Sequence, residues 1–116
     1  MYDNNNIFAK IIRNEIPCDK VYEDERTLFF KDINPKAKIH FLGIPKAEVV
    51  SLSDFILKCK ESEVYYFFQK TIEITNKFDL GKTGYRLITN DGKDANQEVA
   101  HFHVHILGGE NLGGLK

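Results

Sequence analysis

The chain has 116 residues, of which 42% are hydrophobic and 28% are charged, and this composition excludes a disordered or fibrous protein. Its length suits one domain with a single core. The formal net charge of −1 excludes a strongly basic surface, so nucleic acid is not an expected partner.

The first part of the chain predicts a short helix followed by two strands. Asn6 can cap a helix whose apolar residues fall on one side, and Pro17 ends that region. Residues 21–22 and 27–32 predict two strands, and the charged residues between them predict a turn.

The middle of the chain predicts a third strand and one long helix. The strand runs from residue 38 to 44 and is stopped by Pro45. Residues 51–60 are ambiguous and are compatible with a short helical turn. From residue 61 to 78 apolar side chains recur at three- and four-residue steps, which is typical of an amphipathic helix, and Gly81 can cap its end.

Two further strands are predicted at residues 85–89 and 100–107. Five strands with one long and one short helix predict an α+β fold, an antiparallel sheet with its helices on one face. The chain has no apolar run of ~20 residues and does not begin with a signal peptide pattern, so no membrane association is expected. Cys18 and Cys59 lack the spacing of zinc or redox motifs, which favours reduced thiols and a cytoplasmic location.

Three histidines, His101, His103 and His105, alternate with apolar residues in the last predicted strand. Residues two apart in a strand point to the same side, so the three imidazoles are expected on one face. A structural strand has little use for such a row, because a buried imidazole needs hydrogen-bonding partners. The row therefore predicts proton transfer, nucleophilic attack or metal binding.

Zinc is one alternative for this row. Neighbouring histidines lie ~6.5–7 Å apart and can share an ion, but His101 and His105 are roughly 13 Å apart and cannot both reach it through bonds of about 2.1 Å. A zinc site would therefore use two of the three histidines and a ligand from elsewhere, such as His40 or Cys59. Attack on phosphorus is favoured instead, because a neutral imidazole is a good nucleophile and its neighbours can hold phosphate oxygens and the leaving group's proton.

The triple-histidine segment resembles the motif of the histidine-triad (HIT) superfamily, His-x-His-x-His followed by two apolar residues. Further segments are similar to its Hint branch of bacterial type, in the same order, at residues 7–17, 30–35, 40–46, 84–87 and 97–99. We therefore expect a single HIT domain over residues 1–116 with its core at 6–109. The resemblance implies a homodimer with a continuous ten-stranded sheet.

The resemblance also implies an activity, the hydrolysis of purine nucleoside 5′-monophosphoramidates such as AMP linked to an amine. In this interpretation His103 attacks the α-phosphorus and forms a nucleotidyl-histidine intermediate. His105 would bind the phosphoryl oxygens and the leaving-group side, and His101 with His40 would orient the row. No metal and no cofactor are expected, because imidazoles and backbone amides supply the charge stabilisation.

The implied ligand is a purine nucleotide such as AMP or GMP. Asp32 would accept hydrogen bonds from the ribose hydroxyls, although the sequence alone favours a turn-forming role before Pro35. Asn90 and Gln97 match positions that contact phosphate. The apolar slot for the purine would be formed by Ile7, Phe8, Ile11, Phe30 and Ile33. Without the resemblance, the last four of these are most simply core residues.

The chain departs from many relatives at three places. Glu98 replaces a serine that donates to phosphate in some of them, Ala100 replaces an aromatic residue, and the tail after Gly109 lacks a Trp-Pro-Pro type ending. The tail leaves the leaving-group preference open. The alternative functions are a dinucleoside polyphosphate hydrolase, a nucleotidyl transferase, a nucleotide-binding adaptor with little turnover, and a zinc-binding module.

Overall fold

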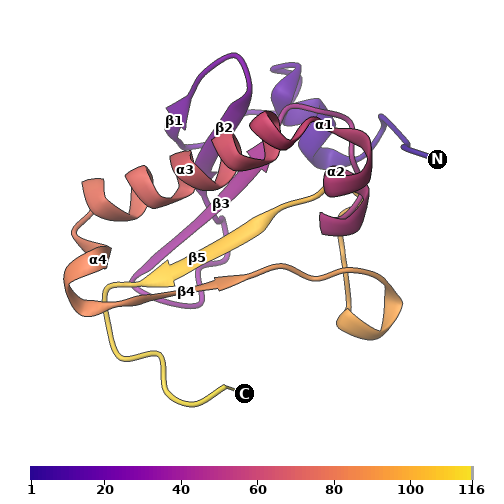
Figure 1. Ribbon diagram of the computed structural model, residues 1–116. Coiled ribbons are helices and arrows are strands. Elements are labelled where there is room, and N and C mark those ends of the chain that lie inside the picture. Colours follow the sequence, from indigo (N-terminus) through magenta and orange to yellow (C-terminus); the bar gives the residue numbers. More distant parts are fainter. Residues whose placement is uncertain (116) are drawn as a thin grey trace.

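A five-stranded antiparallel sheet with the strand order β1-β2-β3-β5-β4 organises the chain (Figure 1). The structure is a computed structural model that describes residues 1–115. The strands are β1 (Lys20–Glu23), β2 (Thr27–Lys31), β3 (Ile39–Pro45), β4 (Tyr85–Ile88) and β5 (Val104–Gly108). The predicted α+β fold with five antiparallel strands is confirmed.

The helices are α1 (Ile7–Ile12), α2 (Leu52–Lys58), α3 (Glu61–Lys77) and α4 (Leu80–Thr83), with a short 3-10 helix at Lys93–Ala95. Asn6 caps α1 as predicted, because its side chain accepts a hydrogen bond from the Ala9 backbone. The ambiguous segment 51–60 contains α2, which Ser51 caps in the same way. Within residues 1–115, no helix combines the length and apolar character that a bilayer crossing requires.

The predicted cap of the long helix at Gly81 is wrong. Helix α3 ends at Lys77, and Gly81 lies inside α4. The chain turns at Asp79, which adopts a left-handed conformation with φ of 60° and so ends the right-handed coil before Gly81 is reached.

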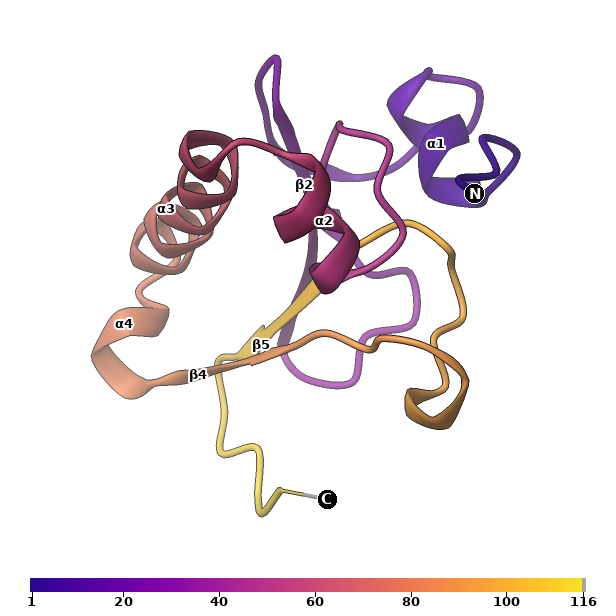
Figure 2. The same cartoon turned by 45° about the vertical axis from the view of Figure 1, so that its right-hand side comes forward.

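Helices cover both faces of the sheet, whereas the sequence predicted one. Figure 2 shows α3 and α1 on opposite sides of β2. On the α3 side, Phe29 and Phe41 pack with side chains of α2 and α3, and on the α1 side, Leu28 and Phe30 pack with Phe8. The physical reason is visible in the uninterrupted apolar run of β2, which buries both of its faces.

Strand β5 begins at Val104, later than predicted, so only His105 of the three histidines lies inside a strand. The alternation nevertheless holds through the extended residues before it. Phe102 and Val104 belong to the core on the α3 side, while His103 packs against Phe8 of α1 on the opposite side. The prediction that the imidazoles and the apolar side chains separate to two faces is confirmed.

Candidate active site

A cleft of about 620 Å³ opens on the α1 side of the sheet, where three segments of the chain meet. Two of the three histidines of the row, His103 and His105, line it together with His40 and Asp32. The other lining residues are Phe8, Asn34, Lys36, Leu42, Ile88, Asn90, Ala95, Asn96, Glu98, Val99 and Leu107. The cleft therefore combines the row of histidines with polar loops on either side.

The protonation of His103 follows from its backbone contact. Its Nδ1 lies 2.8 Å from the carbonyl oxygen of His101, and a carbonyl can only accept, so Nδ1 carries the proton. The other ring nitrogen, Nε2, is left with a lone pair. The hydroxyl of Thr89 donates to the His103 carbonyl at 2.9 Å, and the Phe8 ring packs edge-on against the imidazole at 5.0 Å. These contacts hold His103 in one orientation.

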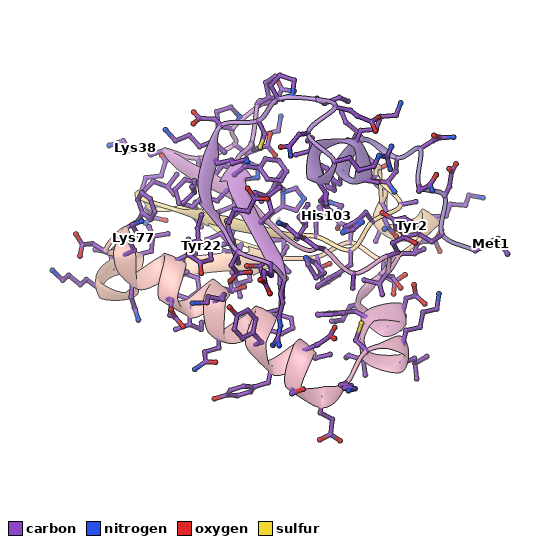
Figure 3. The ribbon with its side chains drawn as sticks, turned by 90° about the horizontal axis from the view of Figure 1, so that it is seen from above. Met1, Tyr2, Tyr22, Lys38, Lys77 and His103 are labelled. Atoms are coloured by element: carbon purple, nitrogen blue, oxygen red, sulfur yellow. The ribbon has the colours of Figure 1, made fainter. Side chains whose placement is uncertain are left out.

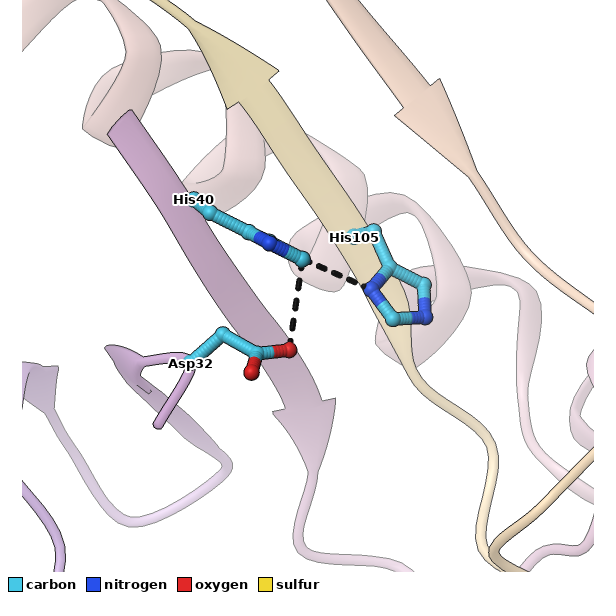
Figure 4. A group of neighbouring side chains, drawn as sticks. All are labelled: Asp32, His40 and His105. Carbon is cyan, nitrogen blue, oxygen red and sulfur yellow. Dashed lines mark hydrogen bonds and ion pairs between the residues drawn. The ribbon is translucent and has the colours of Figure 1, made fainter. Parts of the chain in front are cut away.

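The protonation of His105 follows from its partner His40 (Figure 4). The backbone N–H of Lys36 donates to His40 Nδ1 at 3.0 Å, so the proton of neutral His40 is on Nε2. That nitrogen lies 2.9 Å from His105 Nδ1 and 3.3 Å from a carboxylate oxygen of Asp32. When His40 donates to His105, the proton of His105 is on Nε2, the nitrogen turned away from His40. His103 and His105 thus offer opposite functions, a lone pair and an N–H donor.

All four histidines are held neutral near pH 7. Burial lowers the pKa of His101 to about 4. Burial, reinforced by the neighbouring His103, also lowers the pKa of His105 to about 4. Burial lowers the pKa values of His103 and His40 as well, against the opposing field of Asp32. A neutral imidazole keeps the lone pair that nucleophilic attack needs.

His101 lies behind the cleft and is fully buried, with an exposed fraction of 0%. Its Nε2–H donates to the carbonyl oxygen of Pro45 at 2.8 Å, and its Nδ1 lies 2.6 Å from the hydroxyl of Tyr2. His40 lies at the other end of the row, against His105. His101 and His40, which were predicted to orient the row together, therefore lie at opposite ends of it. No sequence motif pointed to Tyr2, which is 99 residues from His101.

Asp32 fulfils its predicted turn-forming role and also reaches the cleft. One carboxylate oxygen accepts from the backbone N–H of Asn34 at 2.8 Å, and the other is the oxygen near His40. Asp32 also borders a second, apolar cavity of about 780 Å³. Phe8, Asp32 and Leu42 line both cavities, so the two are neighbours.

All five residues predicted for a purine slot line this second cavity, and they differ in burial. Phe8, Ile11 and Phe30 are core residues, as the simpler interpretation expected. Ile33 is 91% exposed, so its assignment to the core is wrong. It lies in the bend that follows β2. Ile7 is also exposed.

The two residues predicted to contact phosphate have different surroundings. Asn90 is half-buried and lines the first cleft. The side chain of Gln97 is instead fully engaged within the chain, because its amide nitrogen donates to the carbonyls of Val50 and Val99 and its oxygen accepts from Gly92. Gln97 therefore ties its loop to the segment at Val50, and its contact with phosphate stays a prediction. The exposed Glu98 lines the cleft directly.

The ligand atoms of Asp32, His40 and His105 lie within 4.8 Å of one another, a spacing that a metal ion could use. The tautomer of His40 opposes this use. Its Nε2 carries a proton as long as Lys36 donates to Nδ1, and a metal needs the lone pair of a deprotonated nitrogen. Cys59, the other candidate zinc ligand, packs against the core on the α3 side.

Comparisons with known proteins agree with this arrangement. A family model described as "HIT domain" matches residues 13–112. An uncharacterized HIT-like protein of Rickettsia prowazekii is 48% identical over 115 residues, which cover 99% of this chain and 96% of the relative. A protein of Escherichia coli named purine nucleoside phosphoramidase is 39% identical over 107 residues, covering 92% of this chain and 89% of the relative. The solved structure of a HIT family hydrolase from Clostridium thermocellum superimposes with a TM-score of 0.83 at 37% identity, covering 97% and 96% of the two chains.

Proposed function

The chain belongs to the HIT domain family, and from this we propose that it hydrolyses the P–N bond of purine nucleoside 5′-monophosphoramidates. The observation that carries the proposal is the opposite protonation of His103 and His105 at one cleft. Phosphoramidate cleavage needs a nucleophile and, beside it, a hydrogen-bond donor for the departing amine. The name of the Escherichia coli relative supports the same substrate class.

The first step is an in-line attack by the lone pair of His103 Nε2 on the α-phosphorus. The new N–P bond forms as the bond to the amine breaks, and the amine nitrogen takes up one proton from solvent water while His105 Nε2–H donates a hydrogen bond to it. The imidazole of His103 becomes positively charged in the nucleotidyl-histidine. Its Nδ1–H already donates to the His101 carbonyl at 2.8 Å, and this hydrogen bond strengthens when the donor is charged.

The second step releases the nucleotide. A water molecule attacks the same phosphorus and gives up one proton to solvent, which balances the proton that the departing amine took up. The N–P bond breaks, the nucleoside monophosphate leaves, and the ring of His103 becomes neutral again.

We place the nucleotide across the two neighbouring cavities. The purine occupies the apolar cavity, the ribose hydroxyls donate to Asp32 at the boundary, and the phosphate reaches His103 in the polar cleft. Asn90 can donate to the phosphate from the opposite loop. Exposed Ile33 and Ile7 gain a function in this arrangement, because a bound purine would cover them.

We also propose a homodimer formed through strand β4, which is at the end of the strand order. Leu87 on this edge strand is exposed, as are Tyr65 and Ile72 on α3. Exposed apolar side chains beside an unpaired strand edge favour pairing with another chain, and pairing of two β4 strands gives a ten-stranded sheet. A cytoplasmic location belongs to the same proposal and rests on the isolated cysteines in the sequence.

The direct test is to trap the intermediate. Brief exposure to adenosine phosphoramidate, followed by acid-free digestion and mass spectrometry, should show one added AMP on His103. An adduct on another residue would overturn the assignment of the nucleophile. Rates on adenosine phosphoramidate and diadenosine polyphosphate measured side by side decide between this function and a dinucleoside polyphosphate hydrolase, and no turnover on either would favour an adaptor.

A further inference from the structure

The segment that precedes α1 reaches the back of the candidate active site. The hydroxyl of Tyr2 lies 2.6 Å from His101 Nδ1, and the two rings pack edge-on with centroids 5.6 Å apart. Tyr2 lies before the stretch matched by the family model, which begins at residue 13.

The donor in this contact is the tyrosine. The Nε2–H of His101 donates to the carbonyl of Pro45, so Nδ1 carries a lone pair and accepts from the Tyr2 hydroxyl. Burial raises the pKa of the Tyr2 phenol, which keeps the hydroxyl protonated. Because His101 is fully buried, loss of this donor leaves a buried acceptor without a partner.

His101, the partner of Tyr2, also contacts His103, the proposed nucleophile. The carbonyl of His101 accepts the hydrogen bond from His103 Nδ1, so one residue connects Tyr2 through its ring and His103 through its backbone. The ring of Phe8 lies edge-on to both imidazoles, at 6.4 Å from His101 and 5.0 Å from His103. Rotation of the His101 ring would disturb its packing against Phe8, the ring that also packs against His103.

Tyr2 is not on a loose end of the chain. The carbonyl of Asp3 accepts from the backbone and the side chain of Asn6, at 3.3 and 2.8 Å. The guanidinium of Arg13 donates to the carbonyl of Asn4 at 2.8 Å. These bonds form a turn that directs Tyr2 toward His101.

We propose that Tyr2 is a positioning residue: its hydroxyl fixes the tautomer and orientation of His101, and through the His101 carbonyl it orients His103 for attack. The kinetic part of this inference rests on the proposed function. The structural part concerns His101 alone, so it can be measured without any substrate.

The test compares Tyr2→Phe with the matched control Tyr22→Phe. The control also loses one hydroxyl, which donates to Asp24 at 3.0 Å, and Figure 3 shows Tyr22 well apart from His103. The ¹⁵N NMR spectrum of the native chain should show His101 protonated at Nε2 and not at Nδ1. Tyr2→Phe should raise the pKa of His101, because the lost donor favoured the neutral ring, and Tyr22→Phe should leave it unchanged.

The kinetic arm uses the same two variants with adenosine phosphoramidate. Tyr2→Phe should lower kcat about tenfold and leave KM nearly unchanged, because Tyr2 does not line the cleft. A third variant, Asp3→Ala, removes the carboxylate that accepts from the Asn5 N–H at 2.9 Å and so loosens the turn. It should move kcat and the pKa of His101 in the same directions as Tyr2→Phe, by less. Equal effects of Tyr2→Phe and Tyr22→Phe on His101 and on kcat would overturn the inference. A chain without phosphoramidate turnover whose His101 still responds to Tyr2→Phe would overturn the proposed function and support the hydrogen bond.

Discussion

His40 lies diagonally across β3 and β5 from His105, and its Nε2 is 2.9 Å from His105 Nδ1. The register places His40 opposite Leu107 and His105 opposite Leu42. The two histidines therefore lie on the same face of the sheet, in neighbouring positions on adjacent strands. The backbone N–H of Lys36 fixes the tautomer of His40, which in turn fixes that of His105. A turn outside the triple-histidine motif thereby sets the protonation of the residue proposed to donate a hydrogen bond to the leaving amine.

The first prediction concerns the nucleophile. His103→Ala removes the only group proposed to bond to phosphorus, so turnover of adenosine phosphoramidate should fall at least about a thousandfold. AMP binding should change little, because the apolar cavity and Asp32 remain in place. Single-turnover kinetics and calorimetry with AMP measure the two quantities separately. A near-normal single-turnover rate in this variant would refute the role of His103.

The second prediction concerns the ribose. Asp32→Asn keeps an oxygen that can accept from the Asn34 N–H, so the turn should survive, while the charge that attracts hydroxyl donors is lost. Binding of AMP should weaken about tenfold, from the loss of hydrogen bonds to a charged acceptor. Binding of 2′,3′-dideoxy-AMP should be the same in both proteins. If the variant weakens both nucleotides equally, Asp32 does not contact the ribose.

The sequence predicted the histidine row well because the pattern that defines the row lies within one short segment. A period of two sends alternate side chains to opposite faces, and this held for His103 and Phe102 even though β5 begins only at Val104. The apolar cavity residues were also predicted, but through the resemblance. Ile33 is the one of these residues that the simpler interpretation wrongly assigned to the core, since an apolar residue that lines a cavity and one in a core have the same sequence pattern.

The contacts that the sequence did not predict all depend on tertiary placement. The pairing of His40 with His105 requires the register of β3 and β5, and the Tyr2 contact joins residues at opposite ends of the chain. Gln97 was assigned to phosphate by position, but only the structure shows its three hydrogen bonds within the chain, one of them to distant Val50. Local propensity carries no information about such partners.

The third prediction concerns the exposed wall of the apolar cavity. Ile33→Ser should raise the KM for adenosine phosphoramidate severalfold, because the purine loses apolar surface that it would otherwise bury. The free energy of unfolding should change by less than about 0.5 kcal/mol, since Ile33 is exposed in the free chain. The matched control is Leu57→Ser, an exposed apolar residue on α2 outside both cavities, which should alter neither quantity. Equal KM values for the native chain and Ile33→Ser would exclude this wall from the binding site.

The fourth prediction concerns stability and pH. Burial lowers the pKa values of all four histidines, to about 4 for His101 and His105, whereas in the unfolded chain they titrate near 6.5. Between these values the unfolded chain binds protons that the folded chain does not. The free energy of unfolding should therefore fall as pH decreases from about 6.5 toward about 4, and be nearly independent of histidine titration above about pH 7.

Urea unfolding between pH 7.5 and 5 measures this dependence, in a window where most carboxylates stay ionised. The slope of the free energy of unfolding against pH gives the number of protons taken up on unfolding. His105→Asn should lower this number by about one. The variant removes a titrating ring but keeps a polar side chain that can accept from His40. A stability that is constant or rises as pH decreases from 6.5 to 5 would show that the row is not held neutral by burial, and the lone pair assigned to His103 would then lose its electrostatic basis.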